Sequence, residues 1–342
     1  MQSIKAEDAF ATLRDNKAGS WADDAPGAAV SRIHGAPARI ASGYAGPKIG
    51  AASPIFAMGS CFAREIEHHL RNSGANVVSV DASLDVPEFR AAAGDVRTGF
   101  FNRFSPRSMW LEFKQAFDDL PAWTEDALLF AAGEELWDFN YRPVPALDYA
   151  PAATRLRRAV AKRLVRRAAE ARVIILTLGM TEAWRHLPSG LYANIIRPAY
   201  VARHRQDFEL RVLDYADTLE CLEEIMALLK RVHATGEFEL VVTVSPVPLG
   251  KTFRPMDVVV ANAESKAVLR TAASAFVAGH ANAHYFPSYE IVTYTAPDQA
   301  WLADRAHVRP ELVRHIVSTF LADVYEEGFA PSALAAEAAS DG

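Results

Sequence analysis

Apolar runs without polar alternation recur along the chain, and segments with a helical period separate them. The runs are "PIFAM" at 54–58, "ANVVSV" at 75–80, "ARVIILTLG" at 171–179, "FELVVTVSP" at 238–246 and "AHYFPS" at 283–288. Helical periods cover 61–73 and the regions near 217–233, 260–278 and 309–326. Strands that are buried on both faces show no alternation, so the pattern predicts parallel strands joined by crossover helices.

Five such strands predict a doubly wound α/β fold, a flavodoxin-like three-layer α/β/α sandwich around a central parallel sheet. The alternation of apolar runs and helical segments is interrupted over 82–170, which we interpret as a mostly helical insertion that covers the sheet edge. It contains a candidate strand, "LWDFNYRPV" at 136–144, and an Arg-rich helix at 153–170. Ligands of such folds bind outside the carboxyl ends of the strands.

The ends of the chain differ in composition from this central part. Residues 1–53 predict an irregular lead-in packed on the core, because 19–53 is rich in Gly, Ala, Pro and Ser. Residues 54–326 then form a single domain. The Ala-rich segment 327–342 predicts a frayed tail.

The composition argues against several classes of protein. Half of the 342 residues are hydrophobic, and the formal net charge of −6 gives no basic footprint for nucleic acid or an anionic membrane. The two cysteines, Cys61 and Cys221, are too few and too far apart for a disulfide framework or a thiolate zinc site. We therefore expect no metal. The absence of an apolar leader or a membrane-length apolar run predicts a cytoplasmic protein, and the sequence leaves the oligomeric state open.

Small and polar residues follow the predicted strands at the edge where a ligand is expected. They are Gly59-Ser60-Cys61, Gly179-Met180-Thr181-Glu182, Ser245-Pro246-Val247-Pro248 and Pro287-Ser288-Tyr289-Glu290. Cys61 falls in the first turn of a helix, where the helix dipole favours a thiolate. The alternative is a tight turn of small residues packed under the helix.

A nucleophile needs a base, and "WLADRAHVRP" supplies a candidate before the last helix. Asp304 and His307 are three residues apart, a spacing at which a carboxylate in a turn can hold one imidazole nitrogen and leave the other for the nucleophile. The alternative is a solvated loop.

Three motifs in this order resemble the blocks of SGNH, or GDSL-like, hydrolases. They are Gly-x-[Ser/Cys] after the first strand, "GMTE" at 179–182 after a middle strand, and Asp-x-x-His before the last helix. The strings "GSCFA" at 59–63, "TLGMTEAW" at 177–184, "VSPVPL" at 244–249 and "YFPSYEI" at 285–291 resemble more closely the GSCFA-domain family, a bacterial group similar to SGNH enzymes.

The resemblance assigns roles to these residues. Gly59 takes the place of the SGNH glycine and Cys61 that of the serine nucleophile, while Ser60 replaces an Asp and is a neighbouring donor or a rival nucleophile. Thr181 stands where SGNH enzymes have an oxyanion-hole Asn. Because Thr is a weaker donor, the hole is expected to use the Cys61 N–H together with Gly99 or Asn102.

The remaining candidates line the pocket. Glu182 either contacts His307 or the substrate, or is simply an acid in the first turn of a helix. Ser245 belongs to the turn that forms the pocket wall. Trp184 and Tyr289 are interpreted as core or pocket lining, although an aromatic face also suits a sugar.

These assignments imply an acyltransferase or esterase that acts on a carbohydrate or another small hydroxyl substrate, in keeping with bacterial polysaccharide biosynthesis. The alternative is an inactive SGNH-like binding protein for a small molecule or saccharide. No cofactor is required, but the Arg-rich helix 155–172 suggests coenzyme A thioester as an acyl donor. The absence of G-x-G-x-x-G after the first strand argues against a dinucleotide enzyme.

Overall fold

A central parallel sheet organises the molecule. The computed structural model describes residues 4–16, 18–21, 27–33, 37–80, 101–118, 125–141, 149–196 and 198–327. The sheet consists of β1 (Pro54–Gly59), β2 (Asn76–Val77), β5 (Val173–Leu178), β9 (Glu239–Val244) and β10 (Ala283–Tyr285). Its order is β10-β9-β5-β1-β2, and all its pairings are parallel. The mixed α/β fold with a five-stranded parallel sheet is therefore confirmed.

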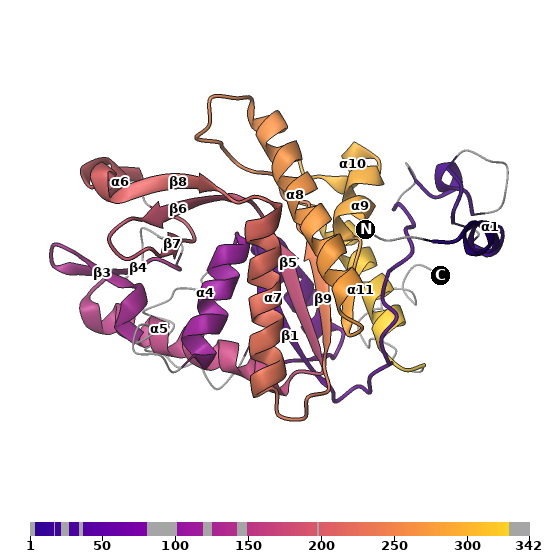
Figure 1. The fold of residues 1–342 in the computed structure, drawn as a ribbon, viewed down its shortest axis with the longest axis horizontal. Helices are drawn as coiled ribbons and strands as arrows, with labels where there is room; N and C mark the ends of the chain where they lie inside the picture. The colour runs from indigo at the N-terminus through magenta and orange to yellow at the C-terminus, as the bar shows by residue number, and fades with distance from the viewer. Residues whose placement is uncertain are drawn as a thin grey trace.

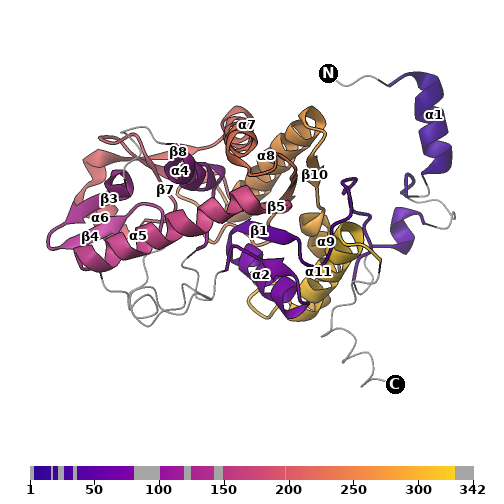
Figure 2. The same cartoon turned by 90° about the horizontal axis from the view of Figure 1, so that it is seen from below.

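Helices cover both faces of this sheet and give three layers (Figures 1 and 2). One face carries α4 (Pro106–Phe117), α5 (Pro151–Arg166), α7 (Tyr215–Val232) and α8 (Val258–Gly279). The other carries α2 (Cys61–Asn72), α9 (Ser288–Tyr294) and α11 (Pro310–Val324). The short helix α10 (Pro297–Ala300) lies at the end of the molecule where the strands finish (Figure 1).

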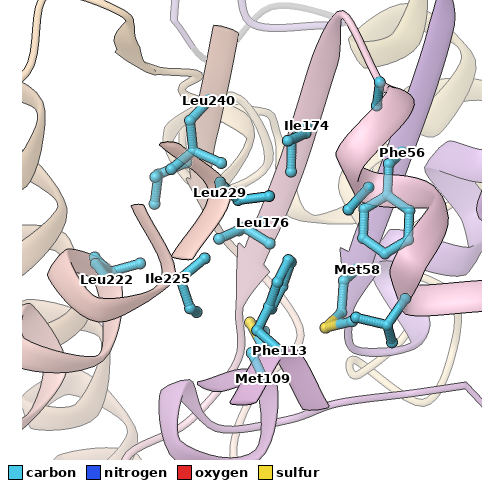
Figure 3. Packing of buried hydrophobic residues seen from close by; sticks show 14 of the residues in the cluster. Phe56, Met58, Met109, Phe113, Ile174, Leu176, Leu222, Ile225, Leu229 and Leu240 are labelled. Carbon is cyan, nitrogen blue, oxygen red and sulfur yellow. The ribbon is translucent and has the colours of Figure 1, made fainter. Parts of the chain in front are cut away.

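Alternate residues of each strand point to opposite faces of the sheet and belong to different hydrophobic clusters. In β1, Phe56 and Met58 enter the cluster under α4, α5, α7 and α8, while Ile55 and Ala57 enter the cluster under α2 and α11. This division follows from the two-residue period of a strand. Figure 3 shows Phe56 and Met58 facing side chains that include Phe113 of α4. Because both faces are apolar, the absence of alternation in the sequence correctly indicated buried parallel strands.

The middle of the chain departs from the expected insertion. Side chains of α4 and α5 belong to the same core cluster as β1 and β5, so this segment covers a face of the sheet rather than only its edge. The region also contains a hairpin of β3 (Leu129–Ala132) and β4 (Glu135–Asp138), the second of which overlaps the candidate strand at 136–144. Short 3₁₀ segments occur at Ala29–Ser31, Glu125–Leu128, Arg167–Glu170 and Arg205–Asp207.

A second small sheet follows β5 and was not expected. It has the order β7-β6-β8 and is antiparallel, with β6 (Glu182–His186), β7 (Tyr192–Ala193) and β8 (Phe208–Val212); α6 (Pro198–Arg203) precedes β8. Two expected strands are shorter than predicted. β2 has only two residues, and β10 stops before Pro287, which has no N–H to donate to a ladder.

The lead-in docks on the core through its second half. The backbone N–H of Ile49 donates to Val324 O, and Ile49 forms a bridge with Tyr325. Lys48 Nζ donates to two carbonyls near the end of α11. The first half contains a helix, α1 (Ala6–Asp15), in which no residue is buried. In the described ranges of the chain, no helix is long and apolar enough to cross a membrane, and the predicted tail beyond residue 327 lies outside those ranges.

Candidate functional site at the carboxyl edge of the sheet

The strand order places the topological switch point of the sheet between β1 and β5. In the central sheet these are the first and third strands along the chain, and the second, β2, lies on the far side of β1. The winding of the sheet therefore reverses between β1 and β5. Crevices at such a reversal, outside the carboxyl ends of the strands, are where open α/β sheets bind ligands. Ser60 and Cys61 follow β1 directly at this point, and Gly179 follows β5.

Two glycines allow the chain to pack tightly here. A Cβ on Gly59 would lie 2.6 Å from Thr177 Cβ and 2.7 Å from Thr177 O, and one on Gly179 would lie 2.5 Å from Phe104 O. These distances are below ordinary van der Waals contact, so neither position accepts a side chain without a backbone shift. A glycine at position 59 therefore allows β1, β5 and α2 to approach closely at the strand end.

The 101–104 segment lies against both strand ends. Asn102 forms a parallel bridge with Gly59, and the N–H of Arg103 donates to Gly59 O at 2.7 Å. On the other side, Phe104 O accepts from the N–H groups of Gly179 and Met180 at 3.1 and 2.8 Å. The switch point is therefore bounded by a segment from the middle of the chain.

Buried ion pairs hold this segment. Arg103 Nε donates to Glu112 Oε1 at 2.8 Å, and Arg158 of α5 also pairs with Glu112, with all three side chains fully buried. Burial raises the pKa of Glu112, but the charges of Arg103 and Arg158 outweigh it and the pKa is lowered. Such a network tolerates the loss of one partner poorly, because a buried charge is left unpaired.

Cys61 is the first residue of α2, and Ser60 is its N-cap. Ser is a common N-cap because its hydroxyl usually accepts a helix N–H, but here the Ser60 side chain makes no such bond. Its Oγ donates instead to Ser245 Oγ at 3.1 Å, and Ser245 directly follows β9. Ser60 is buried, whereas Cys61 is partly exposed, and the first turn of α2 contains no acid. The helix dipole therefore acts on the thiol without a competing negative side chain in that turn.

Candidate oxyanion-hole residues lie at the same edge. Asn102 is 2 % exposed, and among the described residues its Oδ1 has no hydrogen-bond partner. This oxygen can only accept a hydrogen bond, so a role in the oxyanion hole would fall to the Nδ2 group of the same side chain. The N–H of Thr181 is taken by Ser265 Oγ at 3.0 Å. Gly99 lies outside the described residues.

Asp304 and His307 form the predicted pair in the turn before α11. His307 Nδ1 and Asp304 Oδ2 are 2.5 Å apart, and Asp304 Oδ1 accepts from the N–H groups of Ala306 and His307 at 3.0 Å each. The bonds from the His307 N–H and imidazole, with that from Ala306, lower the pKa of Asp304 below its usual range. The carboxylate thus fixes one imidazole nitrogen and leaves Nε2 available. Within the described part of the chain, no hydrogen bond joins His307 to Cys61.

The position of Glu182 excludes one of its two expected roles. It lies on strand β6 and so is not an acid in the first turn of a helix. Its carboxylate accepts from Thr252 Oγ1 at 2.6 Å, from the N–H of Phe253 at 3.2 Å and from Arg254 Nε at 3.0 Å. These partners, rather than His307, fix Glu182, and they tie the loop after β9 to the small sheet.

The predicted aromatic residues flank this edge. Trp184 is half-buried and packs edge-on against Phe253, with ring centroids 5.2 Å apart. Tyr289 is also half-buried, in the first turn of α9, and packs against the main hydrophobic cluster. Both positions agree with the interpretation of core or pocket lining.

The Arg-rich helix α5 is less exposed than its composition suggested. Arg157 and Arg158 are buried; the latter pairs with Glu112 and Asp138. Arg166 Nε donates to a backbone carbonyl, and Arg155 pairs with Asp126. Several guanidinium groups of this helix therefore serve the protein's own packing.

Lys266, a residue of this edge, was not among the candidates that the sequence predicted. Lys266 of α8 is 2 % exposed, and its Nζ donates to the carbonyls of Gly179 at 2.6 Å and Val247 at 2.8 Å. A signal was present, since Lys266 is three, seven and ten residues before Leu269, Ala273 and Phe276, the apolar stripe of α8 that faces the core. In the ranges that the structure describes, no group of three His, Cys, Asp or Glu side chains could hold a metal ion.

Together these observations define an α/β protein with a cysteine, a buried lysine and several hydroxyl groups at the switch point of a parallel sheet. The GSCFA family model matches residues 54–320, which include β1, β5, β9 and most of α11. The chain therefore belongs to the GSCFA family. No curated protein matches the sequence.

Proposed function

We propose that this protein is an acyl-transfer enzyme, an acyltransferase or esterase of SGNH-like type, in which Cys61 is the nucleophile. The observation that carries the proposal is the partly exposed thiol at the first position of α2, at the switch point of the sheet. The buried Ser60 hydroxyl, bonded to Ser245, supports Cys61 over Ser60 as the attacking group. Ser60 then positions the turn.

The chemistry has two steps. The sulfur of Cys61 attacks the acyl carbon, the bond to the leaving group breaks, and an acyl-cysteine forms. His307, held by Asp304, gives a proton to the leaving group, and then takes one from the acceptor hydroxyl that attacks the acyl-cysteine. Asn102 and the N–H of Cys61 are the proposed donors to the oxyanion, and removing one such donor typically lowers turnover by about 10²–10³.

The acceptor is a carbohydrate or another small hydroxyl compound, and the acyl donor an ester or a thioester such as acyl-coenzyme A. The half-buried Trp184 beside Phe253 supports an apolar or sugar-sized contact near the site. The internal pairing of the α5 arginines offers less support for a phosphorylated donor on that helix.

The proposal is tested with a panel of acyl nitrophenyl esters and acyl-coenzyme A thioesters, with water or a saccharide as acceptor. Cys61→Ala should abolish turnover, while Ser60→Ala should retain a measurable fraction. Turnover that survives Cys61→Ala and disappears in Ser60→Ala would assign the nucleophile to Ser60 instead.

A second candidate is a binding protein that has the scaffold without turnover. The missing hydrogen bond between His307 and Cys61 within the described chain favours it. The two candidates differ in an acyl-like thiol probe. Acylation of Cys61 by such a probe that slows in His307→Ala, where the leaving group is no longer protonated, supports the enzyme, and an inert thiol supports the binding protein.

A further inference from the structure

A lysine occupies a position on α8 that the helix otherwise fills with apolar side chains. Lys266 is 2 % exposed, and on its face of the helix are Leu269, Ala273 and Phe276, which are fully buried. Lysine is almost never fully buried unless its charge is paired. Burial of an ammonium without a compensating charge is costly. Lys266 therefore requires a specific partner.

The hydrogen bonds of Lys266 place its amine at the carboxyl edge. Nζ donates to Gly179 O, in the turn after β5, and to Val247 O, in the loop after β9. The preceding residue, Ser265, accepts from the N–H of Thr181 in the same turn. Two consecutive residues of α8 thus fix the segment that follows β5, next to the turn that bears Cys61.

The two carbonyls satisfy hydrogen bonds but carry no net charge. Within the described residues, no carboxylate lies at ion-pair distance from Nζ. Gly59 at the end of β1 is paired with Thr177 of β5, so the Gly179 carbonyl that accepts from Nζ lies beside the turn that bears Cys61. Burial lowers the pKa of Lys266 to about 7, and the Cys61 thiolate acts in the opposite direction. A neutral amine is therefore accessible near neutral pH, beside a thiol that a helix N-terminus favours as thiolate.

We propose that Lys266 receives the thiol proton of Cys61 and holds the thiolate as an ion pair before any acyl donor binds. The S–H bond breaks, the sulfur keeps the electron pair, and an N–H bond forms on Nζ. The ammonium remains bonded to the two carbonyls. This inference rests on the proposed role of Cys61 and assigns different roles to Lys266 and His307. Lys266 acts through Cys61 to prepare the nucleophile, and His307 serves the leaving group and the acceptor.

The experiment follows the alkylation rate of Cys61 by iodoacetamide from pH 5 to 9.5, with mass spectrometry of the Cys61 peptide. The wild-type protein should reach half of its maximal rate below the pH of an ordinary thiol, about 8.5. Lys266→Met, of similar length but without the amine, should move this midpoint up by at least about one pH unit, so that the rate at pH 7 falls about tenfold. His307→Gln should leave the midpoint in place.

Two results would overturn the inference. One is a Lys266→Met protein that is folded, by circular dichroism and urea unfolding, and has the wild-type profile. The other is a His307→Gln protein whose midpoint moves to that of an ordinary thiol. If Lys266→Met does not fold, Lys266→Gln takes its place, because its amide can still donate to the carbonyls but carries no charge. A wild-type profile in that variant would likewise overturn the inference.

The second cysteine, Cys221, should contribute little to the measured alkylation. Cys221 is buried, and burial raises the pKa of its thiol to about 12, so it should react slowly. A Cys61→Ser variant measures any labelling that remains at Cys221.

The inference and the proposed function can fail separately. A midpoint that depends on Lys266, together with acyl transfer that survives Cys61→Ala, would refute the proposed function alone. Acyl transfer that requires Cys61, together with a midpoint that ignores Lys266, would refute the inference alone.

Discussion

The two halves of the proposed site are built in different ways. Around Cys61, groups from β1, β5, β9 and α8 are joined by buried hydrogen bonds between segments far apart in the chain. Asp304 and His307 are joined within one turn, and their side chains are 49 % and 62 % exposed. The first half therefore depends on the whole fold, whereas the second depends on local spacing. Substitutions should therefore separate stability from activity.

The largest effect is expected from a substitution in the exposed half of the site, and it should change activity without changing stability. His307→Gln should lower acyl transfer by about 10²–10⁴, the usual contribution of a general acid or base. It should change the free energy of unfolding by less than about 0.5 kcal/mol, because exposed substitutions rarely do more. Turnover and urea unfolding are measured on the same samples.

A matched control is His204→Gln. His204 lies three residues from Asp207, at 3.6 Å, beside the small sheet, so the pair has the same spacing but a different location. Wild-type turnover is expected there. An equal loss in both variants would show that the Asp304–His307 pair has no special role.

Substitutions in the buried half of the site should mainly lower the free energy of unfolding. Glu112→Gln removes the charge that pairs with Arg103 and Arg158, and should lower the free energy of unfolding by about 3–5 kcal/mol. Glu220→Gln, which removes an exposed partner 2.6 Å from Arg107, should cost less than about 1 kcal/mol. Similar urea midpoints for the two variants would argue that the 101–104 segment does not depend on its buried ion pairs.

A smaller loss is expected from a methyl group at the strand end. Gly59→Ala would place Cβ within 3 Å of Thr177 and Ala63, and such overpacking typically costs about 1–3 kcal/mol. Gly250→Ala is the matched control, since a Cβ there meets nothing within 4 Å. Thermal unfolding compares them, and an unaffected Gly59→Ala protein would contradict the tight contact between β1 and β5.

The smallest effect is a slope of stability with pH. Burial lowers the pKa of Lys266 to about 7, below that of an unfolded lysine, so the unfolded chain binds more protons above pH 7. The free energy of unfolding should therefore rise with pH between 7 and 8.5, by at most about 1.4 kcal/mol per pH unit. Lys266→Met should flatten this rise relative to wild type in urea unfolding. Equal slopes would mean that Lys266 titrates normally.

The same contrast explains what the sequence could predict. The bond between Asp304 and His307 followed from their spacing because a single turn brings them together. The parallel sheet followed from unbroken apolar runs. The contacts of Ser60 with Ser245 and of Lys266 with two loops join segments that only the folded topology brings together.

Other errors also have local causes. The first-turn position expected for Glu182 failed because residues 182–186 pair with β8 as a strand. In α5, a count of arginines could not show that Arg157 and Arg158 face inward. The burial of Lys266, by contrast, could have been predicted, because its place in the apolar stripe of α8 was visible in the sequence.

The central claim is that Cys61 carries the acyl group during turnover. Rapid acid quenching of the protein with an acyl thioester, followed by peptide mapping on a mass spectrometer, tests it most directly. If Cys61 is the nucleophile, the peptide that contains it should gain the mass of the acyl group. This adduct should be stable in acid, released by hydroxylamine and absent from Cys61→Ala. An acyl group on Ser60 or on another peptide, or turnover without any adduct in His307→Gln and wild-type samples alike, would contradict it.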